Sequence, residues 1–450
     1  MRRWCIPTSR GVQNRFRKPY REEAPDDRQH EAAHIRRVRG NVTRLPLECV
    51  VAPPEPDRGV RHPRVLAEVG TPPGRRRLRL PVLRRCVGIP HELGGRGARG
   101  GYRPYVHARR FTTLDHLTNG RLGWNIVTSD MQESLTRLLG ETEVMAHDLR
   151  YDRAEEFVDL CLELWETAWD DDAMVFDKAR RVAIEPSAVR RITHHGTYFD
   201  FDGYYPANPS PQRTPTLMQA GTSPRGLRFA ADFAEAVFVQ KRDIPSAKAV
   251  VARVRDAAEA AGRSRDSVKV VNSVSVIVGD TEAEARELRR SLSTAPSTAA
   301  MAALYMGWSG VDLMQYDPED TLDGVRSEVG QSSALKYQSP DGKSPTVREI
   351  LDGIVETTGG FKITGTPSQC AAELEKIARE TDLDGYLIEC TFGGTVSYDA
   401  FIDKVVPLLR ENGIMPAEPR GGTLRERLIG TPTPALSALP RPVLHPSQSI

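Results

Sequence analysis

The sequence predicts an α/β protein in which helices alternate with buried parallel strands. Three observations from residue 102 onward support this prediction. Several short runs are apolar and β-branched throughout, as strands buried on both faces are. Stretches with helical spacing of apolar residues separate these runs. Five such units follow residue 122, enough for a doubly wound sheet or for the larger part of an eight-stranded barrel.

The first elements are a helix and a strand. Apolar residues from Tyr105 to Leu117 follow helical spacing, and the pair Asn119-Gly120 is typical of a helix C-cap. Residues 122–128 (LGWNIVT) then form a short apolar run, which predicts a strand buried on both faces.

A second helix is expected to begin at Asp152, because Asp152 and Glu155 have the spacing of a capping box. Its core-facing stripe comprises Ala154, Phe157, Val158, Cys161, Leu164 and Trp165. Around residues 199–203 the apolar period becomes two, which predicts a hairpin that leaves the main sheet.

The remaining units continue beyond residue 400. Further strands are predicted at 216–220, 236–239, 270–278 and 385–390. Further helices are predicted after Pro224, through 247–261, from the N-cap Thr366 with Pro367, and through Phe401, Val405 and Leu409. Residues 290–360 interrupt this pattern, as a lid or a substrate loop would.

Charge is distributed unevenly along the chain. Residues 1–100 hold 22 Arg and one Lys against ten Asp and Glu, a balance of +13. Because the whole chain carries +2, the other 350 residues carry −11. The first segment also holds 12 Pro and shows no helical or strand period. We therefore expect a disordered segment at 1–101, a barrel domain at 102–428 and a disordered, proline-rich tail at 429–450.

Three interpretations of the basic segment were compared. A nucleic-acid-binding arm usually mixes Lys with Arg and includes aromatic residues, which this segment does not. A targeting peptide is poor in acidic residues, whereas four lie between residues 22 and 27. The third interpretation, which we prefer, is out-of-frame translation of GC-rich DNA, whose shifted codons favour Arg, Pro, Gly and Ala. No nucleic-acid partner is expected.

The bulk properties favour a soluble, cytoplasmic protein. Hydrophobic residues make up 39% of the chain, but no run approaches the roughly 20 apolar residues of a membrane span. The six cysteines are scattered without a C-x-x-C pair, which argues against a disulfide framework and a thiolate zinc site. We expect no metal and no membrane partner.

The strongest local signal is AGTSPRG (220–226), between a strand and a helix. Gly221 lets the backbone turn close to a ligand, and Thr222, Ser223 and the N–H groups of the helix start can hold a phosphate. An ordinary capped helix explains the pattern equally well. A serine hydrolase does not, because the only histidine after Ser223 is His445, in the tail.

Other candidate residues lie earlier in the chain than this loop. Asn125 and Thr128 come near the carboxyl end of their strand, where barrel active sites form. His147 and Tyr151, four residues apart before the predicted helix, can both point at an anion, or can lie in a surface turn. His194 and His195 are adjacent on a strand and face opposite ways, so they are read as hairpin residues rather than metal ligands.

Five segments together resemble a known family. They are ARRFTTLDHLTNGRLGWNIVTS (108–129), HDLRYDRAEEF (147–157), HHGTYFDFDG (194–203), QAGTSPRG (219–226) and FIDKVVPLLRENGI (401–414). They resemble the nitrilotriacetate monooxygenase large component family, which includes dibenzothiophene-sulfone and long-chain alkane monooxygenases, within the luciferase-like superfamily. The resemblance covers about residues 102–428.

The resemblance implies a (β/α)8 TIM barrel with insertions that takes reduced FMN (FMNH2) from a separate NAD(P)H-dependent flavin reductase. Oxygen adds at flavin C4a, and the hydroperoxide oxidises a small organic substrate. It also implies a homodimer or larger oligomer. Carried over by residue, it assigns FMN contacts to His147, Tyr151 and Ser223, with Ser223 at the phosphate and with Asn125 and Thr128 along the flavin. It assigns no catalytic residue.

The chain departs from the family before residue 102. The family begins with three βα units, which are missing or replaced here, and a frameshift near residue 100 would produce this. The coding DNA upstream of about codon 101 is then expected to encode three βα units in another frame. Two alternatives to the FMN-dependent enzyme stay open, a deazaflavin-dependent oxidoreductase of the same superfamily and a non-catalytic or defective flavin-binding protein.

Overall fold

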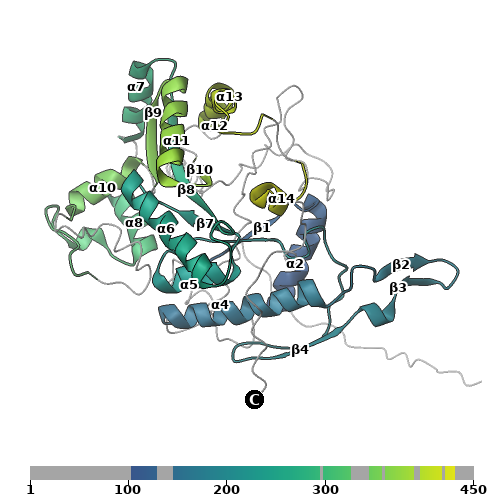
Figure 1. The fold of residues 1–450 in the computed structure, drawn as a ribbon. Coiled ribbons are helices and arrows are strands. Elements are labelled where there is room, and N and C mark those ends of the chain that lie inside the picture. The colour runs from purple at the N-terminus through teal and green to yellow at the C-terminus, as the bar shows by residue number, and fades with distance from the viewer. Residues whose placement is uncertain are drawn as a thin grey trace, which may run out of the picture. The chain divides into compact units, whose positions relative to one another are not determined.

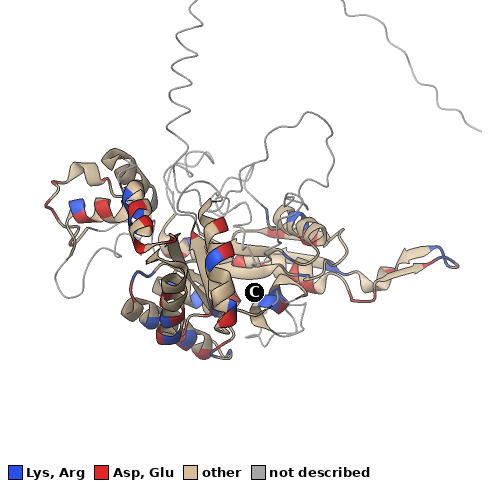
Figure 2. Ribbon diagram, turned by 90° about the horizontal axis from the view of Figure 1, so that it is seen from above, with Lys and Arg blue, Asp and Glu red and all other residues tan. Residues whose placement is uncertain are grey.

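The structure is a computed structural model that describes residues 103–128, 145–293, 297–325, 344–356, 360–389, 396–417 and 421–430. The predicted disordered segment at 1–101 and the tail from 431 lie outside the described residues. Within the described part, no helix has the length and apolarity to cross a bilayer. Acidic and basic side chains are interspersed along its helices (Figure 2).

The centre of the fold is a six-stranded sheet whose paired strands are all parallel (Figure 1). The strand order is β1-β6-β7-β8-β10. β9 also pairs with β8, along residues 274–278, which follow the part of β8 (269–272) that pairs with β7. The strands are β1 (Gly123–Ile126), β6 (Thr216–Gln219), β7 (Ala236–Val239), β8 (Lys269–Val278), β9 (Phe361–Gly365) and β10 (Gly385–Glu389). Among the described residues, β1 and β10 are the two ends of the path.

Helices cover the sheet in two groups (Figure 1). Near β1 lie α2 (Pro104–Thr118) and α4 (His147–Leu162), with the π-helical turn η3 (Glu163–Thr167) continuing α4. Over β7 to β10 lie α5 (Pro224–Phe233), α6 (Ile244–Ala260), α11 (Pro367–Thr381), α12 (Val396–Ala400), the π-helical turn η6 (Phe401–Val405) and α13 (Val406–Glu411). Each group seals one apolar cluster against the strands. This burial is the main stabilising contribution.

Most predicted elements are confirmed. The first helix ends at Asn119, which has the left-handed φ of 52° expected of a C-cap. All five predicted parallel strands are present. Thr366 caps α11 through a capping box, with a proline in the first turn. The hairpin near residue 200 is antiparallel, between β4 (Arg191–His195) and β5 (Asp200–Tyr204).

The predicted start of the second helix is wrong. α4 begins at His147, five residues earlier, and Asp152 lies inside it. Arg150 and Tyr151 are 2% and 5% exposed, and burying this additional turn stabilises the longer helix. Asp152 and Glu155 instead accept hydrogen bonds from the Arg225 guanidinium.

Several elements were not predicted. β9 (Phe361–Gly365) lies between the expected interruption at 290–360 and the predicted helix from Thr366, in residues for which no element was predicted. The hairpin of β2 (Met174–Asp177) and β3 (Val182–Ile184) extends away from the sheet (Figure 1). A 3-10 turn, η4 (Pro186–Ala188), follows it.

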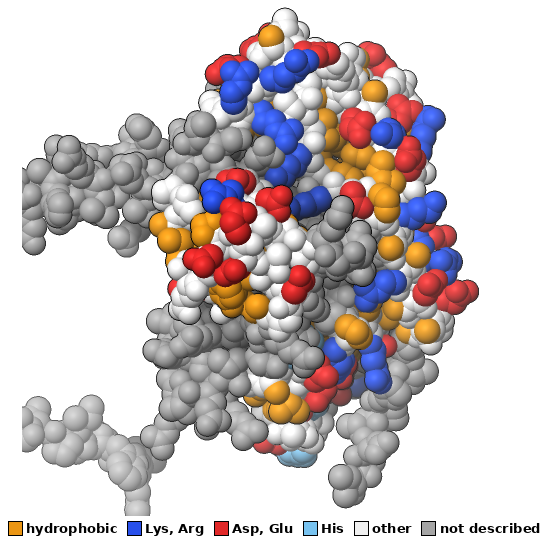
Figure 3. Space-filling view, turned by 90° about the vertical axis from the view of Figure 1, so that its left-hand side faces the viewer, with side chains coloured by type: hydrophobic (Ala, Val, Ile, Leu, Met, Phe, Trp, Pro, Cys, Tyr) orange, Lys and Arg blue, Asp and Glu red, His pale blue; other side chains and the backbone are white. Residues whose placement is uncertain are grey.

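The described part of the expected interruption at 290–360 contains helices. They are α8 (Thr298–Ser309), the 3-10 turn η5 (Leu313–Gln315) and α10 (Val347–Glu356), and α7 (Glu282–Ser293) precedes them. α8, η5 and α10 share their own apolar cluster. On the side of the molecule shown in Figure 3, hydrophobic side chains lie among charged side chains of both signs.

A short C-terminal helix, α14 (Leu424–Ile429), is anchored at the amino ends of the strands. The guanidinium of Arg425, fully buried, donates to Glu235 at 2.6 Å and to the carbonyl oxygens of Thr214 and Gln212. Such a pair is tolerated in the core because its remaining donors are also satisfied. The Arg425–Glu235 pair thus lies at the amino ends of the strands, opposite to the carboxyl ends where the candidate site lies.

Candidate functional site

The predicted site residues converge at the carboxyl ends of β1 and β6. Asn125 lies on β1 and Thr128 follows it, while Gly221 and Ser223 follow β6. These two strands are parallel neighbours, with Asn125 paired to Met218. Their carboxyl ends therefore share one edge of the sheet, which is the edge where ligands bind in such folds.

Tyr151 of α4 is the centre of this cluster. Its ring packs against His147 and Phe229 at centroid distances of 5.2 and 5.6 Å. Its hydroxyl lies so close to the loop after β6 that a Cβ at Gly221 would overlap it, and a Cβ at Gly226 would lie only 2.8 Å away. Gly221 is required because the Tyr151 hydroxyl approaches its backbone closely. The pattern around Gly221 predicts a ligand at this position, whereas the approaching group in the structure is a tyrosine of this chain.

Burial raises the pKa of Tyr151, while hydrogen bonding to Thr128 and Ser223 opposes the rise. The phenol is therefore a neutral donor at physiological pH. Gln219 Nε2 donates to its oxygen at 3.4 Å. Three residues that the sequence placed in separate elements, Tyr151, Thr128 and Ser223, thus form one polar group.

Ser223 is the N-cap of α5. Its Oγ accepts a hydrogen bond from Gly226 N at 3.0 Å. This is the ordinary cap that the sequence also allowed. The two interpretations are compatible, because a capping hydroxyl that accepts through its oxygen still has a proton to donate. Pro224 at the start of α5 has no N–H and the Gly226 N–H is used by the cap, so α5 adds the Arg225 N–H and the positive end of the helix dipole to an anion site there.

Arg225 ties α5 to α4. Its guanidinium donates to Glu155 at 2.7 Å and to Asp152 at 2.8 Å, and it lies 5.5 Å from the centroid of the Tyr151 ring. These contacts raise the pKa of Arg225 further. The two carboxylates neutralise this cation, so its role is to hold Tyr151 and the start of α5 in register.

His147 is the first residue of α4 and is mostly buried, with 16% of its side chain exposed. Its Nδ1 lies 2.7 Å from an oxygen of Asp148, which leaves Nε2 as the ring atom for a ligand. The structure brings His147 beside Tyr151, but on the helix rather than before it.

Asn125 supplies a polar atom that has no partner. Its Oδ1 is buried without a hydrogen bond among the described residues. Trp124 and Ile126, its neighbours on β1, pack into the cluster under α2 and α4, so Asn125 faces the other side of the sheet. An orphaned buried carbonyl oxygen is costly unless a ligand donates to it.

Two cations near the β6 loop were not predicted. Arg253 of α6 donates through Nη2 to the carbonyl oxygen of Thr222 at 3.3 Å. Lys241 follows β7, and Asn272 holds its backbone through bonds of 2.8 and 3.0 Å. Burial, followed by the charge of Arg253, lowers the pKa of Lys241. Lys241 had a signal in the sequence, since it lies two residues after a predicted strand. Arg253 had none, because its role depends on tertiary packing.

The sheet and this polar edge define the protein as an α/β enzyme of the barrel type, with a ligand site at the carboxyl ends of its strands. Among the described residues no cluster of three His, Cys, Asp or Glu forms a metal site.

Comparison with known proteins establishes the family. Residues 97–384 match the luciferase-like monooxygenase family, and the chain belongs to it. The dimethyl-sulfide monooxygenase of Hyphomicrobium sulfonivorans is 37% identical over 330 residues, covering 73% of this chain and 68% of that protein. The dibenzothiophene-sulfone monooxygenase of Rhodococcus erythropolis is 34% identical over 347 residues, covering 75% of each.

Solved structures agree with this assignment. A riboflavin lyase crystallised with modified FMN and riboflavin has a TM-score of 0.70 and 36% identity, covering 74% of this chain and 73% of that one. A long-chain alkane monooxygenase has a TM-score of 0.67 and 36% identity over similar shares, 74% and 73%. The predicted family and the luciferase-like barrel class are confirmed, and the chain is a flavin-dependent monooxygenase of this family.

Proposed function

We propose that this chain binds reduced FMN at the carboxyl edge of β1 and β6 and uses O2 to oxidise a small organic substrate. The observation that carries the proposal is the convergence of Tyr151, Ser223 and the start of α5 at that edge, beside an orphaned oxygen of Asn125. Among similar proteins, one is an FMNH2-dependent dimethylsulfone monooxygenase, and the riboflavin lyase structure contains modified FMN.

The residues present fit this cofactor. A flavin phosphate requires hydrogen-bond donors and positive potential, which the Ser223 hydroxyl, the positive end of the α5 dipole, Arg253 and Lys241 would supply. The flavin ring has N–H donors, and the Oδ1 of Asn125 is an acceptor without a partner in the part of the chain that the structure describes. His147 and Tyr151 would contact the phosphate side, and Thr128 the ring side.

The reduced flavin supplies the electrons that activate O2, one atom of which enters the substrate while the other leaves as water. The chain's residues bind and orient the flavin and exclude water from it. A separate NAD(P)H-dependent flavin reductase would deliver the reduced cofactor, and we propose a homodimer or larger assembly.

The test has two stages. Oxidised FMN, followed by its fluorescence, and reduced FMN, followed by anaerobic calorimetry, are each titrated against the full chain, and saturable binding of the reduced form is expected. Oxygen consumption is then followed with a flavin reductase, NADH and FMN, with and without candidate substrates. Flavin binding without substrate-dependent oxygen use would indicate a non-catalytic flavin-binding protein, and absence of binding would refute the proposal.

A further inference from the structure

The hairpin of β2 and β3 forms an arm that extends away from the sheet (Figure 1). Its base is fixed, because Trp169 forms a backbone bridge with Val189 and its side chain is buried. Beyond this base, none of the strand residues 174–177 and 182–184 is buried. Since a two-stranded hairpin alone is marginally stable in water, burial of the arm against a partner would stabilise it.

The arm exposes large apolar side chains. Phe176 is 65% exposed, Val175 39% and Ile184 38%. Phe176 also lies within the bulge of β2 at a φ of 47°, which is unfavourable for an aromatic residue. Tyr204, 61% exposed, lies near the base, because the carbonyl oxygen of the next residue accepts a hydrogen bond from Trp169. Clustered exposed apolar groups of this kind are typical of protein–protein contacts.

The turn of the arm is held in one conformation. The carboxylate of Asp177 accepts hydrogen bonds from the backbone N–H groups of Ala179 and Arg180, both at 2.9 Å. The Arg180 guanidinium donates to Glu185 on the other side of the turn at 2.6 Å. A preorganised arm loses less conformational entropy when it binds a partner.

The two ends of the arm carry opposite charges. Residues 170–172 at the base are three aspartates, whereas the turn holds Lys178, Arg180 and Arg181 (Figure 2). The first two aspartates and Arg180 have ion pairs within the chain. Within the described ranges, Asp172, Lys178 and Arg181 have none. The base thus has an uncompensated anion and the turn two uncompensated cations, separated by roughly 20 Å of extended chain.

We propose that this arm is the homodimer interface, in which two copies lie antiparallel about a two-fold axis near Val175, with β2 beside β2. A two-fold axis places the base of each arm against the turn of the other, so Asp172 faces the partner's Lys178 at two equivalent contacts. Val175 and Phe176 meet their counterparts near the axis, and the turn reaches the partner's exposed Tyr204. Because the arm is complementary in charge to itself, the expected partner is a second copy of this chain.

The inference rests on the homodimer of the proposed function and specifies its interface. The test is sedimentation velocity of the full chain over a series of concentrations. The parent is expected to be a dimer, or a larger assembly built from such dimers. Asp172→Lys and Lys178→Glu each place like charges at both equivalent contacts, so each should raise the dissociation constant of the dimer by about tenfold or more.

An equimolar mixture of the two variants should recover the parental dissociation constant, because every contact then again joins opposite charges. Phe176→Ser tests the same surface without a change of charge and should also weaken the dimer by about tenfold. Lys248→Glu is the matched control, since Lys248 is an exposed lysine of α6 away from the arm, and it should leave the dimer unchanged. Circular dichroism of each variant should match the parent.

A parent that stays monomeric at every concentration would overturn the proposal. So would a dimer that neither reversal weakens, or one that the mixture of variants does not restore, because the copies would then meet through another surface. Assembly through the arm in a chain that does not bind FMN would refute the proposed flavin site and leave this inference standing, so the two failures are distinguishable.

Discussion

Replacing Gly221 with alanine tests whether the Tyr151 hydroxyl sets the shape of the loop after β6. The added Cβ would lie 2.5 Å from Nε2 of Gln219 and closer still to Oη of Tyr151, against about 3.4 Å for ordinary contact. Both side chains must therefore move by about 1 Å. Tyr151 is 5% exposed and Gln219 is 2% exposed, so neither side chain can move into solvent. Overpacking of this kind costs about 1–3 kcal/mol of unfolding free energy.

The assay is a double-mutant cycle in urea, followed by circular dichroism. Tyr151→Phe removes one of the two atoms that the new Cβ meets and leaves the overlap with Gln219, so Gly221→Ala should cost about 0.5–1.5 kcal/mol less in that background. Gly385→Ala is the control, because its Cβ would meet only Val271, at 3.9 Å, and we expect a change within about 0.5 kcal/mol. An equal cost of Gly221→Ala in both backgrounds would refute the assigned contact.

Two further predictions concern charge. Arg253→Gln with Lys241→Gln should weaken FMN binding by about tenfold and leave riboflavin affinity unchanged, measured by fluorescence titration; equal losses for both flavins would contradict a phosphate role. His107 is 1% exposed, and burial lowers its pKa from 6.5 to about 3. Between these values only the unfolded state binds the proton, so stability falls with falling pH by up to about 1.4 kcal/mol per unit. His107→Leu should remove that part of the slope in urea melts at pH 4 to 7, and an unchanged slope would show that His107 is not the titrating group.

The sequence predicts the strand–helix order well because the parallel strands are buried on both faces and their apolar runs are unambiguous. Leu217 and Val237, for example, are fully buried. The prediction fails where local and tertiary signals compete. Asp152 and Glu155 form a good capping pattern, but Arg225 from a distant helix binds both carboxylates, and α4 begins five residues before Asp152.

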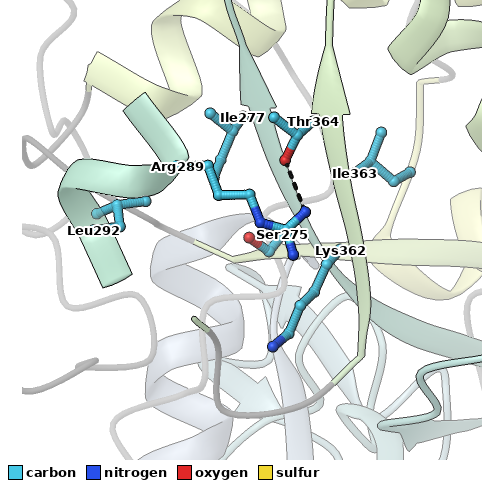
Figure 4. A pocket seen from close by; sticks show the side chains of 7 residues that line it. All are labelled: Ser275, Ile277, Arg289, Leu292, Lys362, Ile363 and Thr364. Atoms are coloured by element: carbon cyan, nitrogen blue, oxygen red, sulfur yellow. Dashed lines mark hydrogen bonds between the residues drawn. The ribbon is translucent and has the colours of Figure 1, made fainter. Parts of the chain in front are cut away.

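The candidate site was predictable only where its chemistry is local in the sequence. Gly221 and Ser223 occupy a strand–helix junction whose chemistry is local, so their position follows from sequence. Gln219, whose Oε1 is buried without a partner among the described residues, is identified only by its packing against Tyr151. The packing of α7 against β9, where Arg289 donates to Thr364, joins residues 75 apart in the sequence (Figure 4). No local pattern encodes that contact.

The most direct test of the central claim compares FMN with riboflavin in Ser223→Ala. If Ser223 and the start of α5 hold the flavin phosphate, this variant should lose about 1–3 kcal/mol of FMN binding free energy. Its affinity for riboflavin, which lacks the phosphate, should match that of the parent chain. Equal losses for both flavins, or no loss for FMN, would contradict the claim that this helix start is the phosphate site.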